Sequence, residues 1–169
     1  MRRLLDRLYG LAAWAAALCM IGTLVMILLS VGGRLIGFHV RGTDAYAGYF
    51  MAAAAFLALA HTLKRGEHIR VTLILEHGGP KVKRLLDLWS HLAGTGLAAV
   101  LAWFAARLVW QSWTFNDVSQ GNDATPLWIP QIGMALGTLV LLIAFVDELV
   151  MELRGQRVAV ASDEALHNE

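Results

Sequence analysis

Four long stretches without a charged residue set the pattern of this chain. The shortest holds 19 consecutive uncharged residues and the longest holds 26. None of the four shows the polar face that a helix of a soluble bundle presents to water. A helix that crosses a bilayer needs about 20 apolar residues, and a single charge at its centre costs about 2.5–3.5 kcal/mol. The pattern therefore predicts four transmembrane helices, over residues 8–31, 45–63, 88–110 and 127–146.

The link between the second and third stretches mixes basic and apolar residues. From Leu63 to Glu76 it reads LKRGEHIRVTLILE. Its basic residues suit an anionic inner leaflet, and its apolar residues can dip into the acyl boundary. A lone strand at that surface would leave its backbone polar groups unpaired. We therefore predict a short interfacial helix here, which ends at the Gly78-Gly79-Pro80 sequence.

Composition agrees with a membrane protein. Apolar residues make up 57% of the chain and charged residues only 16%, whereas soluble domains carry about 25% charged residues. A net charge of +1 gives no footprint for nucleic acid. The first stretch is too long for the apolar core of a cleaved signal peptide, so we predict that it stays as the first helix.

The distribution of Lys and Arg predicts the orientation. Of the 14 Lys and Arg residues, 11 lie before the first stretch, in the link or after the fourth stretch. The positive-inside rule then places both termini and the link in the cytoplasm. The prediction is an all-α membrane protein, with a transmembrane domain over residues 1–155 and a disordered cytoplasmic tail over 156–169.

Two histidines are the strongest candidates for chemistry. His61 and His91 are expected near the inner ends of the second and third helices, so the pair could ligate one haem in a four-helix membrane cytochrome. The interpretation that we favour is a pair of interfacial histidines that hydrogen-bond to the link or to a partner. No cluster of three or four metal ligands and no catalytic motif is present in the sequence, so no enzyme activity, cofactor, metal or substrate site is predicted.

Small residues and isolated charges mark candidate contact surfaces. Gly48 and Ala52 in the second helix, and Gly133 and Gly137 in the fourth, follow the small-xxx-small pattern that lets helix backbones approach closely. The pattern does not say whether the neighbour belongs to this chain or to another. Asp44 and Arg107 are expected on the periplasmic side. They are candidates for docking a periplasmic protein, although solvation of Asp44 and simple anchoring of Arg107 at the interface are the alternatives.

Three segments resemble the small membrane subunit, of the DctQ type, of tripartite ATP-independent periplasmic (TRAP) transporters. The link RGEHIRVTLILEHGGPKVKRLLDL contains the His-Ile-x-Val core of that family, as His68, Ile69 and Val71. GTDAYAGYF resembles the acidic start of its second helix, although Ala45 stands where a second acidic residue often follows. PLWIPQIGMALG resembles the proline-aromatic start of its fourth helix. The resemblance extends from the first helix to Leu153.

The resemblance implies a role that depends on partners. In the family, a large membrane subunit carries the substrate and sodium sites, and a soluble periplasmic protein delivers the substrate. The small subunit is thought to brace the fixed part of the large one. The resemblance therefore implies sodium-driven uptake of an organic acid, with His68, Ile69 and Arg70 of the link at the partner interface or the membrane surface.

Overall fold

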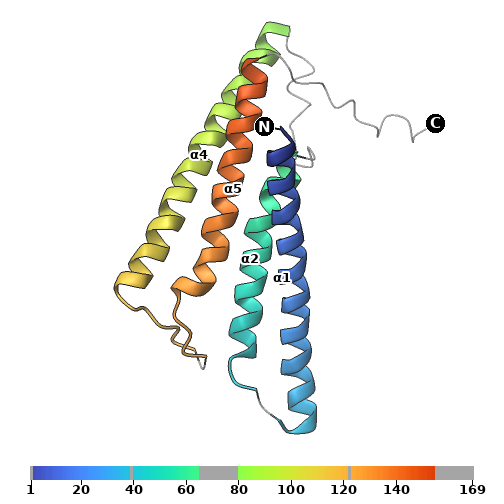
Figure 1. Cartoon of the computed structure of the whole chain (residues 1–169), viewed down its shortest axis with the longest axis vertical. Helices are drawn as coiled ribbons and strands as arrows, with labels where there is room; N and C mark the ends of the chain where they lie inside the picture. The colour runs from blue at the N-terminus through green and yellow to red at the C-terminus, as the bar shows by residue number, and fades with distance from the viewer. Residues whose placement is uncertain (1, 39, 65–79, 122, 155–169) are drawn as a thin grey trace, which may run out of the picture.

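The computed structural model describes residues 2–38, 40–64, 80–121 and 123–154 (Figure 1). Four helices account for nearly all of these residues: α1 (Arg2–Ile36), α2 (Thr43–Lys64), α4 (Pro80–Thr114) and α5 (Trp128–Leu153). All four are long and apolar enough to cross a membrane. The described part of the chain contains no strand, only one isolated bridge between Val118 and Pro126. The prediction of an all-α protein with four membrane-spanning helices is confirmed.

The helices extend beyond the predicted spans. α1 and α4 are 35 residues long each, which is about 52 Å at 1.5 Å per residue, whereas the hydrocarbon core is about 30 Å thick. Both helices therefore reach well past the hydrocarbon. The predicted interfacial helix, with His68, Ile69 and Arg70, and the predicted tail lie outside the described residues. The orientation across the membrane stays a prediction.

The four helices form a single layer in the order α1–α2–α5–α4. α2 packs against α1 on one side and α5 on the other, and α4 packs against α5 (Figure 1). Among the described residues, α4 contacts no other helix, and α1 meets α5 only briefly. This arrangement differs from a closed four-helix bundle, in which each helix has two neighbours around a common core.

Small residues line the contacts within the layer, while large apolar residues face outward. The most deeply buried apolar residues are mostly alanines, including Ala60 and Ala144 with 0% exposure. Trp14 and Leu97, in contrast, are 73% and 72% exposed. A soluble protein would bury such side chains. In lipid, helices gain little by hiding leucine and associate instead through close backbone packing, so this distribution is the one expected for a protein in a bilayer.

The layer has two distinct ends. At one end, which we call the terminal end, α1 and α4 begin and α2 and α5 end (Figure 1). At the other, which we call the loop end, α1 connects to α2 and α4 connects to α5. An even number of crossings puts the start of α1 and the end of α5 at the same end, as the predicted topology requires.

Candidate functional site

A cluster of charges joins three helices at the terminal end. The ammonium group of Lys64, on α2, donates hydrogen bonds to the carboxylates of Asp147 and Glu148 on α5, the second at 3.2 Å. It also lies 5.2 Å from the centre of the Tyr9 ring on α1. The three charged side chains are only 13–21% exposed. A partly buried cation between two carboxylates resists separation of the helices, because removal of one partner leaves uncompensated charge.

The contact between Lys64 and Asp147 was not predicted from the sequence. A signal was present, since both charges end a stretch on the same predicted side of the membrane. The hydroxyl oxygen of Tyr9 is buried without a hydrogen-bond partner among the described residues. The Tyr9 ring therefore acts here as an apolar and cation-binding surface.

A second polar network closes the loop end. Asp123 accepts hydrogen bonds from the Ser119 hydroxyl at 2.7 Å and from the Tyr49 hydroxyl of α2 at 2.9 Å. The Tyr46 hydroxyl lies 2.9 Å from that of Thr125. The hydrogen bond from Ser119, with those from Thr125 and Tyr49, lowers the pKa of Asp123 to about 2. The carboxylate is thus held in its charged form, and it ties the connection before α5 to the start of α2.

Backbone geometry at the loop end supports this network. Gly42 has a φ of +82°, and a Cβ atom there would lie 2.8 Å from that of Asp123. A larger residue would be strained and would push the connection away. The 115–127 connection is also held internally, by the hydrogen bond from the Leu127 amide to the Asp117 carbonyl at 2.9 Å. Trp113 and Trp128 pack edge to face across its base, with ring centres 4.9 Å apart.

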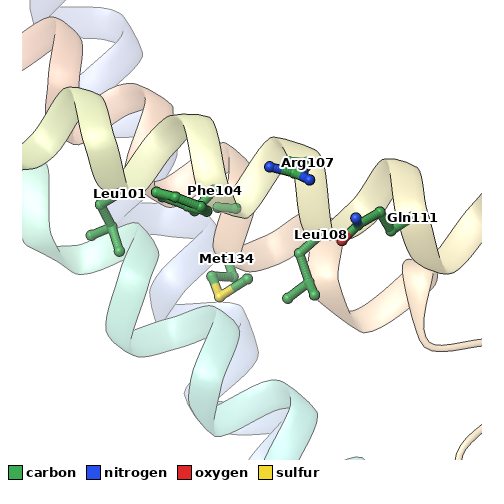
Figure 2. Close-up of a pocket in the computed structure, with 7 residues that line it drawn as sticks. Leu101, Phe104, Arg107, Leu108, Gln111 and Met134 are labelled. Atoms are coloured by element: carbon green, nitrogen blue, oxygen red, sulfur yellow. The ribbon is translucent and has the colours of Figure 1, made fainter.

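The predicted docking charges have different surroundings. Asp44 accepts a hydrogen bond from Ser30 at 2.8 Å and pairs with Arg34 at 3.6 Å, so its carboxylate already contacts α1. Arg107 instead faces a groove between α4 and α5 (Figure 2). Within the described residues, the structure records no cation–π contact of Arg107 with the rings of Trp103 or Trp110.

The two rows of small residues also differ in their surroundings. A Cβ atom on Gly133 would lie 2.7 Å from the Ala53 Cβ of α2, and one on Gly137 would lie 2.5 Å from backbone atoms of Phe56. Gly133 and Gly137 therefore belong to the contact between α5 and α2 of this chain, which identifies the neighbour that the small-residue pattern had left open. Gly48 and Ala52 face outward, and no atom lies within 4 Å of a Cβ atom built on Gly48.

The structure does not support the haem alternative. His61 is on α2 and His91 is on α4, and α5 lies between these two helices. The Nδ1 atom of His91 lies 2.7 Å from the Asp87 carbonyl oxygen of its own helix and donates to it. Across residues 2–38, 40–64, 80–121 and 123–154 there is no group of three or more side chains that could hold a metal ion.

Comparison with protein families identifies the family of the chain. No curated protein matches the chain. A sequence profile described as "Tripartite ATP-independent periplasmic transporters, DctQ component" matches residues 23–155. Among the described helices, that range covers α2, α4 and α5 completely and the part of α1 from Thr23 to Ile36. The match spans well over half of the 169 residues, and the chain therefore belongs to the DctQ family, the small permease components of TRAP transporters.

Proposed function

We propose that the chain braces the large membrane subunit of its transporter in a bacterial inner membrane. The transporter takes up an organic acid, delivered by a periplasmic binding protein, and is driven by a sodium gradient. The observation that carries this proposal is the one-layer arrangement α1–α2–α5–α4, which leaves large apolar side chains exposed on its surface. A flat, apolar layer suits a support placed beside a moving partner, because it offers a long contact surface without an interior to deform.

The distribution of charge supports an accessory role rather than independent transport. A carrier that moves an anion and cations by itself usually has polar groups or broken helices near the midplane. In the described part of the chain, the Lys64 cluster lies at the terminal end of α2 and Arg107 lies near the loop end of α4. The middle of each helix is apolar and unbroken. The substrate and ion sites are therefore assigned to the large subunit.

The outward row of small residues on α2 is our candidate contact with the large subunit. Gly48, Ala52 and Ala55 follow one another at helical spacing, and all three are exposed. A helix of another subunit can approach the α2 backbone closely at such a row. We also keep His68, Ile69 and Arg70 of the link in this proposal, on the basis of the family resemblance.

The loop end is our candidate surface for the periplasmic binding protein. The excess of Lys and Arg near the termini and in the link favours a cytoplasmic terminal end, which puts the loop end in the periplasm. There, the hydrogen-bonded connection over 115–127 and the Arg34–Asp44 pair offer fixed polar groups. Asp44 keeps its proposed docking role as part of this pair. Arg107 is left out of this docking surface because its side chain lines the groove beside α4.

Reconstitution tests the bracing role. The large subunit is placed in liposomes with and without this chain, with the binding protein and its substrate outside and an inward sodium gradient. We expect uptake to require both membrane subunits and the gradient. The small chain alone is expected to bind no substrate. Equal uptake without the small chain, or substrate binding by the small chain alone, would contradict the proposal.

A second comparison tests the contact surface. Gly48→Leu on the outward row of α2 is compared with Leu97→Ala, which changes an exposed residue on α4, at one edge of the layer. We expect Gly48→Leu to reduce co-purification with the large subunit and Leu97→Ala to leave it unchanged. Equal co-purification of the two variants would remove α2 from the interface.

A further inference from the structure

Arg107 is the one charged residue within the predicted span 88–110 of α4. It lies seven residues before α4 ends at Thr114, or about 10 Å along the helix axis. The structure gives it no ion pair within the described residues, whereas Arg34 and Lys64 both have one. A cation at this depth is costly unless its side chain reaches the interface or meets a negative group. Arg107 therefore either extends to the interface or meets a negative group from outside the described chain, and a lipid phosphate satisfies both conditions.

The groove beside Arg107 has a volume of about 500 Å³ and an apolar wall. Figure 2 shows the wall side chains along α4, with one residue contributed from the opposite side by α5. From its first to its last α4 residue, the groove extends over ten positions, or about 15 Å. The apolar α4 residues of the groove run from Leu101 to Leu108, or about 10 Å, which is about two thirds of a hydrocarbon leaflet of about 15 Å. Leu101, Phe104 and Leu108 of α4 and Met134 of α5 form the apolar wall.

Two polar side chains line the same groove near its loop end. Arg107 and Gln111 are four residues apart on α4, so they lie on one face about 6 Å apart along the axis. A guanidinium group offers a planar fork of donors that fits phosphate oxygens, and the glutamine amide adds further donors. Trp110 and Trp113, which are 71% and 58% exposed, flank this position. Exposed tryptophans favour the headgroup level of a bilayer, so the donors lie close to the depth of lipid phosphates.

We propose that this groove binds one glycerophospholipid of the leaflet at the loop end. The lipid phosphate accepts hydrogen bonds from Arg107 and Gln111, and one acyl chain lies against the apolar wall. A single cation matches a single phosphate in charge, and an apolar wall about 10 Å long matches the part of an acyl chain next to the headgroup. A carboxylate from another protein would satisfy the cation but would leave the rest of the groove to be filled by a different group. The inference does not depend on the bracing role.

The test measures lipid binding to the full chain by native mass spectrometry. The chain is purified in a mild detergent and titrated with phosphatidylglycerol. We expect one lipid to bind more tightly than the rest. Arg107→Gln should weaken that binding about tenfold or more, since charge-assisted hydrogen bonds exceed neutral ones. Arg34→Gln is the matched control, because it removes an exposed cation at the same end but outside the groove, and it should leave binding unchanged.

Further arms separate the lipid from other occupants. Gln111→Leu keeps the charge of Arg107 and should weaken binding several-fold, which gives an independent result if Arg107→Gln does not fold. Glycerol phosphate, which lacks acyl chains, should not compete at the concentrations where the lipid saturates. The same lipid should remain bound when the chain is purified with its large subunit.

Four results would overturn the proposal. The first is unchanged lipid binding in Arg107→Gln or in Gln111→Leu, and the second is an equal loss of lipid binding in Arg107→Gln and Arg34→Gln. The third is competition by glycerol phosphate as strong as that by the lipid itself. The fourth is loss of the lipid from the complex with the large subunit, together with a cross-link between Arg107 and a partner carboxylate. The last result would assign the groove to a protein contact instead.

Discussion

Gly137 should be a position where one added methyl group destabilises the chain. Its Cβ atom would lie 2.5 Å from the Phe56 carbonyl carbon and 2.6 Å from the carbonyl oxygen. These are backbone atoms, so rotation of a side chain does not relieve the clash. α5 and α2 must separate by about 0.9 Å to restore a contact of 3.4 Å. Overpacking of this kind typically costs about 1–3 kcal/mol.

Gly48→Ala is the matched control for Gly137→Ala. Both changes occur inside helices, and replacement of glycine by alanine favours a helix by about 0.8–1 kcal/mol in each case. Nothing lies within 4 Å of the new methyl group at Gly48, so that variant should keep the gain. The difference between the two variants therefore isolates the clash, and it should be about 1–3 kcal/mol.

The assay is unfolding of the purified chain in mixed micelles with increasing sodium dodecyl sulfate, followed by circular dichroism and tryptophan fluorescence. Gly137→Ala should unfold at a lower detergent fraction than Gly48→Ala. Coincident transitions would refute the close α2–α5 contact. A lower stability of Gly48→Ala than of Gly137→Ala would show that α2 is packed within the chain on the face that the structure leaves open.

Three further predictions follow from the two ends of the layer. Lys64→Met should lower the free energy of unfolding by about 1–3 kcal/mol. This loss is smaller than the roughly 3–5 kcal/mol for fully buried pairs, because the cluster is partly exposed. Lys64→Arg, which keeps the charge, should lose less stability in the same assay. Asp123 has a pKa lowered from 3.8 to about 2. Its contribution to stability should be complete above pH 4 and lost as the pH falls toward 2, and Asp123→Asn should abolish this dependence; an unchanged profile in Asp123→Asn would contradict the assignment. A reporter that is active only in the periplasm should be silent after Glu169 and active near Asp117, and the opposite pattern would refute the orientation.

The existence of the helices could be predicted from the sequence because charges are excluded from the bilayer centre. The ends could not. The first span was predicted over residues 8–31, but α1 runs from Arg2 to Ile36. At the headgroup level charges such as Arg7 and Arg34 cost little, so they do not end a helix. Charge-free runs therefore give the part of a helix inside the hydrocarbon, and not its full length.

The order of the helices in the layer was beyond the sequence for a related reason. A helix surrounded by lipid is apolar on all sides, so the pattern carries no inward face. Gly48 and Gly137 illustrate the limit, since they occur in similar small-residue rows but point away from and toward a neighbouring helix, respectively. The polar contacts between helices could not be predicted from the sequence either. Tyr49 and Asp123 are 74 positions apart, and only the fold brings them together.

The one-layer order has a consequence for how the chain is made. α4 is synthesised before α5, yet among the described helices α5 is the only one that α4 contacts. The end of α5 follows that of α4 by 39 residues, which takes about 2–8 s at 5–20 residues per second. During that time α1 and α2 can already pair, because they are neighbours in both sequence and space. Among the described helices, α4 therefore has no partner to pack against until α5 has entered the membrane, so it joins the layer only through the helix that is made after it.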